Sequence, residues 1–407
     1  SDGDSESATG DAIRLLMSGK RIARDEVVIM TKAGILQGRI LSFIRNNPSL
    51  QENLIPLSSN AAFSIAPEMI RLQVELSLLR LGLKTIDIFL LQNVEELYYS
   101  LLRDYPEKEA LSKFYYQIHL AFETLEELRF EKKISFIGIA SNALRDTETG
   151  ISLENFLALA PDNFSAIQFP ANILESEILE STSANLASGA GLYAIAGRPL
   201  NATSHKGLIR LACMTPEPNI IAESIEMDRL IADLLYAEGK IIELFSKRRF
   251  RFNEKLPSLS VILDQYRHAL QTPDHLQKHK KEMLSIINEG IKQLKILSEK
   301  KEEAYAVEAY ARLCGAIFSR LDIMSRINDH ERMLSLQKRL QNISHDISDL
   351  AMLAIRALLA FDVPDTVLCG MRNISYVRQL CTNFRLPGMS QDTAKAIIQE
   401  TKKWVVE

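Results

Sequence analysis

The sequence has little of what marks secreted, membrane or nucleic-acid-binding proteins. Its 407 residues include only four cysteines, and these lie far apart with no Cys-x-x-Cys pair. We therefore expect buried free thiols and no disulfide framework. No run of 18 uncharged apolar residues occurs, so no membrane-spanning helix is predicted. Lys and Arg number 48 against 52 Asp and Glu, and this net charge of −4 argues against a nucleic-acid partner. These absences predict a cytoplasmic globular protein with neither a membrane nor a nucleic-acid partner.

Signatures of several enzyme classes are also missing. No apolar run is followed by Gly-x-Gly-x-x-Gly, and no Gly-x-Ser-x-Gly, His-Glu-x-x-His or Walker A pattern occurs. His275 and His279 have a spacing that suits a metal on a helix. Lysines crowd this pair and a third ligand is not evident, so we interpret it as a solvated face and predict no metal. The segment Lys247–Phe252 mixes basic and aromatic residues, which suits single-stranded nucleic acid, but we prefer a cation-rich helix end.

Short apolar runs alternate with amphipathic stretches over the first half of the chain and return near its end. The predicted strands are Val27–Met30, Ile86–Leu91, Ile134–Ala140, Ala166–Phe169, Leu192–Ala196 and Thr366–Cys369. Helices are predicted between them, for example over 67–83 and 111–130, and a long polar loop precedes Pro67. Continuous apolar strands separated by helices indicate a parallel sheet covered by helices. About six such units fit an open doubly wound sheet or most of a (β/α)₈ barrel.

Between about Ile220 and Ser348 the strand patterns stop and long helical stretches follow. The predicted helices cover 224–249, 259–270, 275–300, 304–327 and 330–350, with a break at Arg326–Asp329. We interpret this region as a helical insertion. The chain is accordingly divided into a barrel part, residues 1–205 and 348–407, and a helical insertion, residues 206–347.

Several segments, taken in order, resemble motifs of the aldo-keto reductases. Residues 24–34, RDEVVIMTKAG, resemble the third strand of that family, which ends in a Lys. Residues 77–93, SLLRLGLKTIDIFLLQN, look like its SLxRLGLDYIDLYLLHNP segment, and residues 122–142 are similar to LEELVREGKIRYIGVSN. The series continues in family order with Gln168, Asn172, RPLNA at 198–202, GMR at 370–372 and YV at 376–377. The resemblance covers roughly residues 1–205 and 348–400.

This resemblance implies a TIM (β/α)₈ barrel whose site lies at the carboxyl ends of the strands. The family reduces carbonyls with Asp, Tyr, Lys and His. Lys32 matches the Lys, whose charge lowers the Tyr pKa, and Gln92 replaces the His that orients the carbonyl. The segment Asp2–Glu6 resembles the turn just after the catalytic Tyr. We therefore expect an N-terminally truncated, incomplete barrel of about six strands, without the first two strands and their Asp and Tyr.

The resemblance also implies a site for the nicotinamide of NADP. Ser141, Asn142 and Gln168 would hydrogen-bond its carboxamide, although the first two also suit an ordinary turn and Gln168 a structural partner. Gly197 stands where many members carry an aromatic residue that stacks on the nicotinamide. Tyr376 is assigned to the cofactor site as well, although a tyrosine at helical spacing from Leu380 is more often a packing residue than a cofactor contact.

A second set of positions would bind the phosphates of the cofactor. By resemblance, Arg198, Pro199 and Leu200 would lie along the pyrophosphate. Gly370 would allow a close backbone approach to a phosphate. Arg372 could bind a 2′-phosphate and so favour NADP over NAD, although a helix cap or an ion pair would explain it equally well.

Two hypotheses of different classes follow. In the first, the protein is an NADP-dependent oxidoreductase acting on a carbonyl/alcohol pair, impaired in this chain by the missing Asp and Tyr and by Gln92. In the second, it is a pseudoenzyme, a catalytically inactive relative kept for binding or regulation, with a protein partner on the helical insertion. A small carbonyl compound is the expected substrate class. An incomplete barrel leaves two strands without neighbours, so we expect a gap between the Val27 strand and the Thr366 strand.

Overall fold

The computed structural model describes nine stretches of the chain, residues 3–51, 53–145, 150–204, 207–213, 227–246, 258–266, 273–345, 349–371 and 373–406. The chain divides into two compact units. The barrel unit comprises Ser1–Pro199 and Ala354–Lys402, and the helical unit comprises Leu200–Leu353 and Lys403–Glu407. The two units have separate apolar cores.

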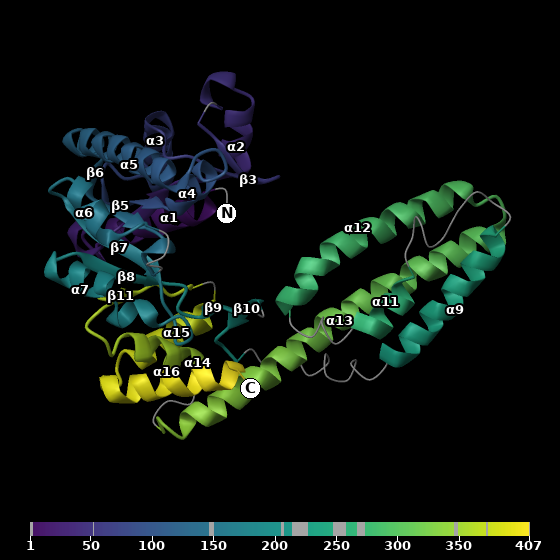
Figure 1. The fold of residues 1–407 in the computed structure, drawn as a ribbon. Coiled ribbons are helices and arrows are strands. Elements are labelled where there is room, and N and C mark those ends of the chain that lie inside the picture. Colours follow the sequence, from purple (N-terminus) through teal and green to yellow (C-terminus); the bar gives the residue numbers. More distant parts are fainter. Residues whose placement is uncertain are drawn as a thin grey trace. The chain divides into compact units, whose positions relative to one another are not determined.

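A six-stranded parallel sheet forms the centre of the barrel unit (Figure 1). In spatial order its strands are β1 (Met30–Ala33), β5 (Ile86–Gln92), β6 (Ile134–Ala140), β7 (Phe164–Pro170), β8 (Tyr193–Gly197) and β11 (Thr366–Val367). Each neighbouring pair is parallel. Within the described residues β1 and β11 do not pair, so the sheet is the wall of an incomplete (β/α)₈ barrel. The expected gap between these two strands is confirmed.

One face of the sheet is buried beneath helices. The helices α3 (Pro67–Leu81), α5 (Glu107–Phe130) and α7 (Thr182–Gly189) pack against β1, β6 and β8, respectively. Alternate strand residues such as Phe89 and Ile139 are fully buried beneath these helices. Further helices are α1 (Asp4–Ser18), α4 (Glu95–Leu101), α6 (Leu153–Leu159), α14 (Leu350–Leu358), α15 (Ile374–Asn383) and α16 (Gln391–Val406).

The opposite face, which would line the inside of a closed barrel, is apolar but only partly covered. Its buried cluster consists of Ile88, Leu90, Ala140, Ala166 and Ile195. Phe136 and Tyr193 share this face, because they lie an even number of residues from cluster members on their own strands. They are 48% and 44% exposed. The amino-terminal end of this face therefore leaves large apolar side chains in contact with solvent.

The first strand begins later than predicted. It was expected over Val27–Met30, but β1 starts at Met30, and Val28 is 72% exposed. The cause is the side chain of Asp87, whose Oδ2 accepts a hydrogen bond from the Ile29 amide at 2.6 Å. This carboxylate binds the amide that a strand partner would otherwise bind, and regular pairing begins at the next residue, Met30.

The predicted polar loop before Pro67 is also wrong. It contains a three-stranded antiparallel sheet in the order β2 (Ile35–Gln37), β4 (Ala61–Phe63) and β3 (Ile55–Ser58), together with the helix α2 (Gly38–Arg45). Buried residues including Leu36, Leu41 and Met69 form a small core beneath it. Strands of three or four residues are too short to show a clear alternation, which explains the error.

The helical unit contains a β-hairpin, β9 (Asn201–Ser204) and β10 (Gly207–Arg210), and the helices α9 (Met227–Phe245), α11 (Leu259–Tyr266), α12 (Pro273–Leu297) and α13 (Lys301–Gln341). The predicted break at Arg326–Asp329 is wrong, since α13 is one helix of 41 residues. Asn328 and Asp329 are poor helix formers but not breakers. Buried residues on both sides, including Ser325 and Met333, keep one face of the helix packed.

Three further sequence predictions bear on this architecture. All four cysteines are free, as predicted, but only Cys314 is buried; Cys213 and Cys369 are half-buried and Cys381 is exposed. Among the described residues, none of the helices combines the length and the apolar character that crossing a membrane requires. The segment Lys247–Phe252 lies outside the residues that the structure describes.

The exposed inner face predicts self-association of this chain. The outer edges of β1 and β11 have no strand partner among the described residues, and Phe136 on the central strand β6 leaves apolar area uncovered. We expect oligomers or aggregates in size-exclusion chromatography with light scattering, and we expect Phe136→Glu to reduce them. Leu79→Glu, at a 76% exposed position on α3, is the matched control and should have little effect. A cooperatively melting monomer would contradict this expectation.

Candidate functional site

The carboxyl ends of the strands carry most of the side chains that the sequence singled out. Lys32 lies on β1, Gln92 ends β5, and Gln168 lies on β7. The register aligns Gln92 with Ala140 and Ala140 with Gln168, so the two glutamines occupy one row across the sheet. Residues paired in this way in a parallel sheet point to the same face. The fold therefore places both glutamines on the inner face at the end where barrel enzymes have their sites.

Lys32 and Gln168 are in direct contact. Nζ of Lys32 donates a hydrogen bond to Oε1 of Gln168 at 3.0 Å, although two strands separate β1 from β7. The curvature of the sheet brings the two side chains together. Burial lowers the pKa of Lys32 from its ordinary value. No carboxylate of the described residues pairs with this amine, so burial acts on it without a compensating charge.

Gly197, at the end of β8, leaves space for the amide of Gln168. A Cβ atom at position 197 would lie 3.0 Å from Nε2 of Gln168, closer than ordinary side-chain contacts. Because an ammonium group only donates, Lys32 must be bound to the oxygen of Gln168. Nε2 of Gln168 therefore keeps its hydrogen atoms for another acceptor, and it forms no hydrogen bond with the described residues.

Ser141 and Asn142 are held by an acidic residue that the sequence analysis missed. Glu95, the first residue of α4, is only 2% exposed. Its Oε2 accepts a hydrogen bond from Oγ of Ser141 at 2.7 Å. Its Oε1 accepts from the backbone amide of Asn142 at 3.1 Å and from Nδ2 of Asn142 at 2.6 Å. The available signal was an acidic residue just beyond a strand end, directly at the start of a helix.

Arg198 lies next to the end of β8, and its guanidinium forms an ion pair within the chain. Its guanidinium lies 3.7 Å from Oε1 of Glu175, which is almost completely buried. The backbone of Arg198 is left-handed, with φ 54°. Pro199 is buried, and Leu200, with which the helical unit begins, accepts a backbone hydrogen bond from Leu211 at 2.8 Å. The three residues predicted along the pyrophosphate therefore have structural partners of their own.

The remaining predicted residues are Gly370, Tyr376, Arg372 and Gln92. Gly370 is exposed, and a Cβ there would meet open space, so the close approach expected of it has no counterpart within the chain. Tyr376 is 40% exposed on α15. Arg372 lies outside the described residues. The Gln92 side chain is half-buried and forms no hydrogen bond with any residue that the structure describes.

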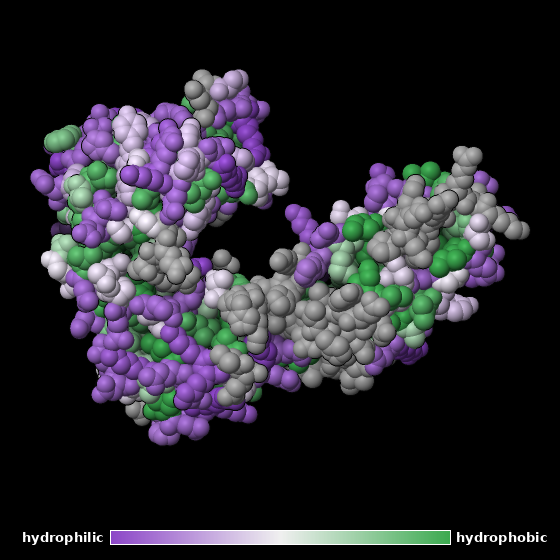
Figure 2. Space-filling model, viewed as in Figure 1, coloured by the Kyte–Doolittle hydropathy of each residue, from purple (hydrophilic) through white to green (hydrophobic). Residues whose placement is uncertain are grey.

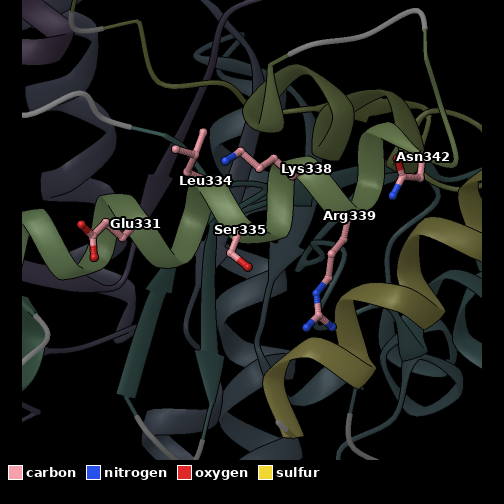
Figure 3. Close-up of a pocket in the computed structure, with 6 residues that line it drawn as sticks. All are labelled: Glu331, Leu334, Ser335, Lys338, Arg339 and Asn342. Carbon is pink, nitrogen blue, oxygen red and sulfur yellow. The ribbon is translucent and has the colours of Figure 1, made fainter.

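Neither of two surface cavities coincides with this site. A depression of about 440 Å³ runs along α13 and is lined by Glu331, Leu334, Ser335, Lys338, Arg339 and Asn342 (Figure 3). A second cavity, of about 420 Å³, lies where β3 and β4 meet α4 and α5. Neither contains a residue predicted for chemistry or cofactor binding. In the described part of the chain, no cluster of three His, Cys, Asp or Glu could hold a metal ion.

The sequence of most of the barrel unit matches a known protein family. The Aldo/keto reductase family model matches residues 1–207, half of the chain. The chain belongs to the aldo-keto reductase family. No curated protein sequence matches it closely enough to count as a relative. Among the residues that the structure describes, this aldo-keto reductase chain has the six-stranded wall, with Lys32 on β1 and Gln92 at the end of β5.

Solved structures of aldo-keto reductases are similar at low identity. A glycerol dehydrogenase from Gluconobacter oxydans is 14% identical, with 100% of this chain and 79% of that chain covered and a TM-score of 0.49. The holo form of an aldo-keto reductase from Bacillus halodurans is 14% identical, with 98% and 78% covered and a TM-score of 0.45. An aldo/keto reductase from Klebsiella pneumoniae, in complex with NADP and acetate, is 20% identical, with 48% of each chain covered and a TM-score of 0.28.

The buried amine of Lys32 predicts a pH-dependent stability. Its pKa is lowered in the folded state, so above that pKa and below the unfolded value the unfolded chain binds more protons. The contribution of Lys32 to the free energy of unfolding therefore rises with pH in this window. We expect Lys32→Met to raise the free energy of unfolding most, relative to the wild type, at neutral pH. This difference should shrink as the pH approaches about 10. Urea denaturation at several pH values measures the difference.

The control for this experiment is Lys133→Met. Hydrogen bonds to Glu131 and Glu75 raise the pKa of Lys133. A raised pKa gives a contribution that is complete below the unfolded value, so the difference from the wild type should stay constant between neutral pH and about pH 10. Parallel curves for Lys32→Met and Lys133→Met would show that Lys32 is not a perturbed amine.

Proposed function

We propose that this chain binds NADP at the carboxyl ends of its strands and acts as an oxidoreductase on a carbonyl/alcohol pair. The contact between Nζ of Lys32 and Oε1 of Gln168 carries this proposal. It brings the family's positively charged strand-end residue against a proposed cofactor-binding amide, on the inner face of the barrel wall. A cytoplasmic location is part of the proposal, and the four free cysteines support it, since reducing compartments keep thiols unpaired.

The unengaged polar atoms suit a nicotinamide carboxamide. Gln168 offers Nε2 as a donor, and Asn142 offers Oδ1 as an acceptor, since its Nδ2 is bound to Glu95. A primary carboxamide has one carbonyl oxygen and one NH₂ group, so it matches one donor and one acceptor. Ser141 binds Glu95 through its hydroxyl hydrogen and adds a further acceptor. When bound, NADP would supply the hydride donor or acceptor.

The carbonyl side of the proposal depends on Gln92 and Lys32. Gln92 has an amide NH₂ that can donate a hydrogen bond to a carbonyl oxygen, so it can orient a substrate. It has no titratable proton near neutral pH, unlike His, so it cannot relay a proton. Lys32 adds positive charge at the same strand ends, and any negative charge that develops on the oxygen would be stabilised there. We infer that orientation is retained at this site and that proton handling is impaired.

A binding or regulatory function is the second candidate, favoured by the surface of the helical unit. Apolar patches interrupt its polar surface (Figure 2). On α9, Leu235 and Ile242 lie seven residues apart on one helix face and are 57% and 48% exposed, and the neighbouring Tyr236 is 77% exposed. Such a stripe suits a protein partner. In this candidate the family fold serves binding, and no carbonyl is reduced.

The first prediction of the proposal concerns the dinucleotide. We expect NADPH to bind more tightly than NADH, by about tenfold or more, because a guanidinium recognises the additional phosphate. Arg372→Ala should remove this preference, and Arg378→Ala, an exposed arginine nearby in the sequence, should retain it. Fluorescence titration of the reduced dinucleotides measures both affinities. Equal affinities in the wild type would refute the 2′-phosphate assignment, and binding of neither dinucleotide would leave the second candidate.

The second prediction concerns Gln92. The resemblance places the family's Asp and Tyr on strands before residue 2, so the test uses a fusion in which such strands precede α1. In that fusion Gln92→His should raise the rate of NADPH-dependent aldehyde reduction. Each tenfold gain corresponds to about 1.4 kcal/mol of barrier. Gln391→His, at an exposed position at the start of α16, should leave the rate unchanged. A rate that Gln92→His does not raise would remove Gln92 from carbonyl orientation.

A further inference from the structure

Glu95 is a buried carboxyl residue that binds two of the three residues expected at the nicotinamide carboxamide, Ser141 and Asn142. It is 2% exposed and accepts three hydrogen bonds, from Oγ of Ser141, the backbone amide of Asn142 and Nδ2 of Asn142. In each of these hydrogen bonds an oxygen of Glu95 is the acceptor, so both Ser141 and Asn142 direct their hydrogen atoms toward it.

This direction determines what Ser141 and Asn142 can offer to a ligand. The hydroxyl hydrogen of Ser141 is used by Glu95, and its oxygen also accepts from the backbone amide of Ala143 at 3.1 Å. Nδ2 of Asn142 is used by Glu95, which leaves Oδ1. Both side chains therefore present acceptor atoms to any further partner. A ligand group at this strand end needs a donor to satisfy them.

Lys32 gives Gln168 the opposite polarity. The amine binds Oε1, so Nε2 is the polar atom of Gln168 that remains for a ligand, and it is a donor. The backbone connects the two sides closely, because the amide of Ser141 donates to the carbonyl of Gln168 at 3.0 Å. Adjacent strand ends thus offer acceptors on β6 and a donor on β7. A primary carboxamide satisfies both, whereas a carboxylate or a methyl ketone has no donor for the oxygen of Asn142.

We propose that Glu95 is a positioning residue that holds Ser141 and Asn142 as acceptors and thereby makes the site select a primary carboxamide. The inference rests on the proposed function, since it assumes that the dinucleotide binds at these strand ends. Glu95 does not touch the ligand itself. Its effect is to deny the two side chains the alternative orientation in which they would donate.

The experiment compares three dinucleotides on the full chain by isothermal titration calorimetry. The probes are NADP⁺, its analogue with a carboxylic acid in place of the amide, and its 3-acetylpyridine analogue, which has a methyl group there. We expect wild-type protein to bind NADP⁺ about tenfold or more tightly than either analogue, since each analogue leaves a polar atom unsatisfied. The acetylpyridine analogue carries no added charge, so it separates hydrogen-bond polarity from simple repulsion by Glu95.

Glu95→Gln tests the positioning role. The oxygen of a glutamine must face the backbone amide of Asn142, which only donates, so its NH₂ group lies against Oγ of Ser141. The hydroxyl hydrogen of Ser141 is then released for the ligand, and the preference should fall to within about threefold. Glu96→Gln is the matched control, because it removes the same charge from the adjacent residue of α4, which makes no side-chain contact with Ser141 or Asn142. It should keep the full preference. Circular dichroism confirms that each variant is folded.

The outcomes separate this inference from the proposed function. Binding of no dinucleotide overturns both. Binding of all three with equal affinity by the wild type leaves the dinucleotide site standing and overturns the inference alone, without any variant. A preference in the wild type that Glu95→Gln retains shows that Glu95 is only structural, and that too overturns it. A preference that is lost in Glu95→Gln and kept in Glu96→Gln supports it.

Discussion

Parallel pairing of neighbouring strands is the constraint on which the candidate site depends. In a parallel sheet the carboxyl ends of all strands lie at one edge, and side chains in one register row share a face. The row through Gln92, Ala140 and Gln168 follows from this geometry, and so does the position of Ser141 directly beyond β6. Residues separated by more than a hundred positions, such as Lys32 and Gln168, are in contact only because four strands keep one register and curve together.

Two ionisable side chains at this edge, the buried Glu95 and the half-buried Lys32, differ in their partners. Glu95 has three donors around it, whereas Lys32 has one amide oxygen and no carboxylate among the described residues. The first arrangement is stable because every bond to the carboxylate is made. The second leaves an amine that burial disfavours in its charged form. Glu95, beside the end of β6, therefore has three hydrogen-bond donors, whereas the amine of Lys32 on β1 has no carboxylate beside it among the described residues.

Features that depend on a short stretch of sequence were predicted correctly, whereas features that depend on packing between distant segments were not. The strand over Ile134–Ala140 was predicted to the residue, because a mainly apolar segment there, ISFIGIA, is bounded by lysines and by Ser141. The break in α13 and the polar loop before Pro67 were wrong, since packing overrode weak local signals in both. Lys32, Gln92 and Gln168 came from the family resemblance. Glu95 could not, because its role exists only once α4 and the end of β6 are side by side.

The glycine at position 197 has a consequence for how this site can change by mutation. A side chain there would press on the amide of Gln168, and that amide is bound through its oxygen to Lys32. Positions 197, 168 and 32 are therefore epistatic, and the effect of a substitution at one depends on the residues at the other two. A larger residue introduced at 197 would meet Nε2 of Gln168 first, so that amide would have to shift, and its hydrogen bond to Lys32 would shift with it.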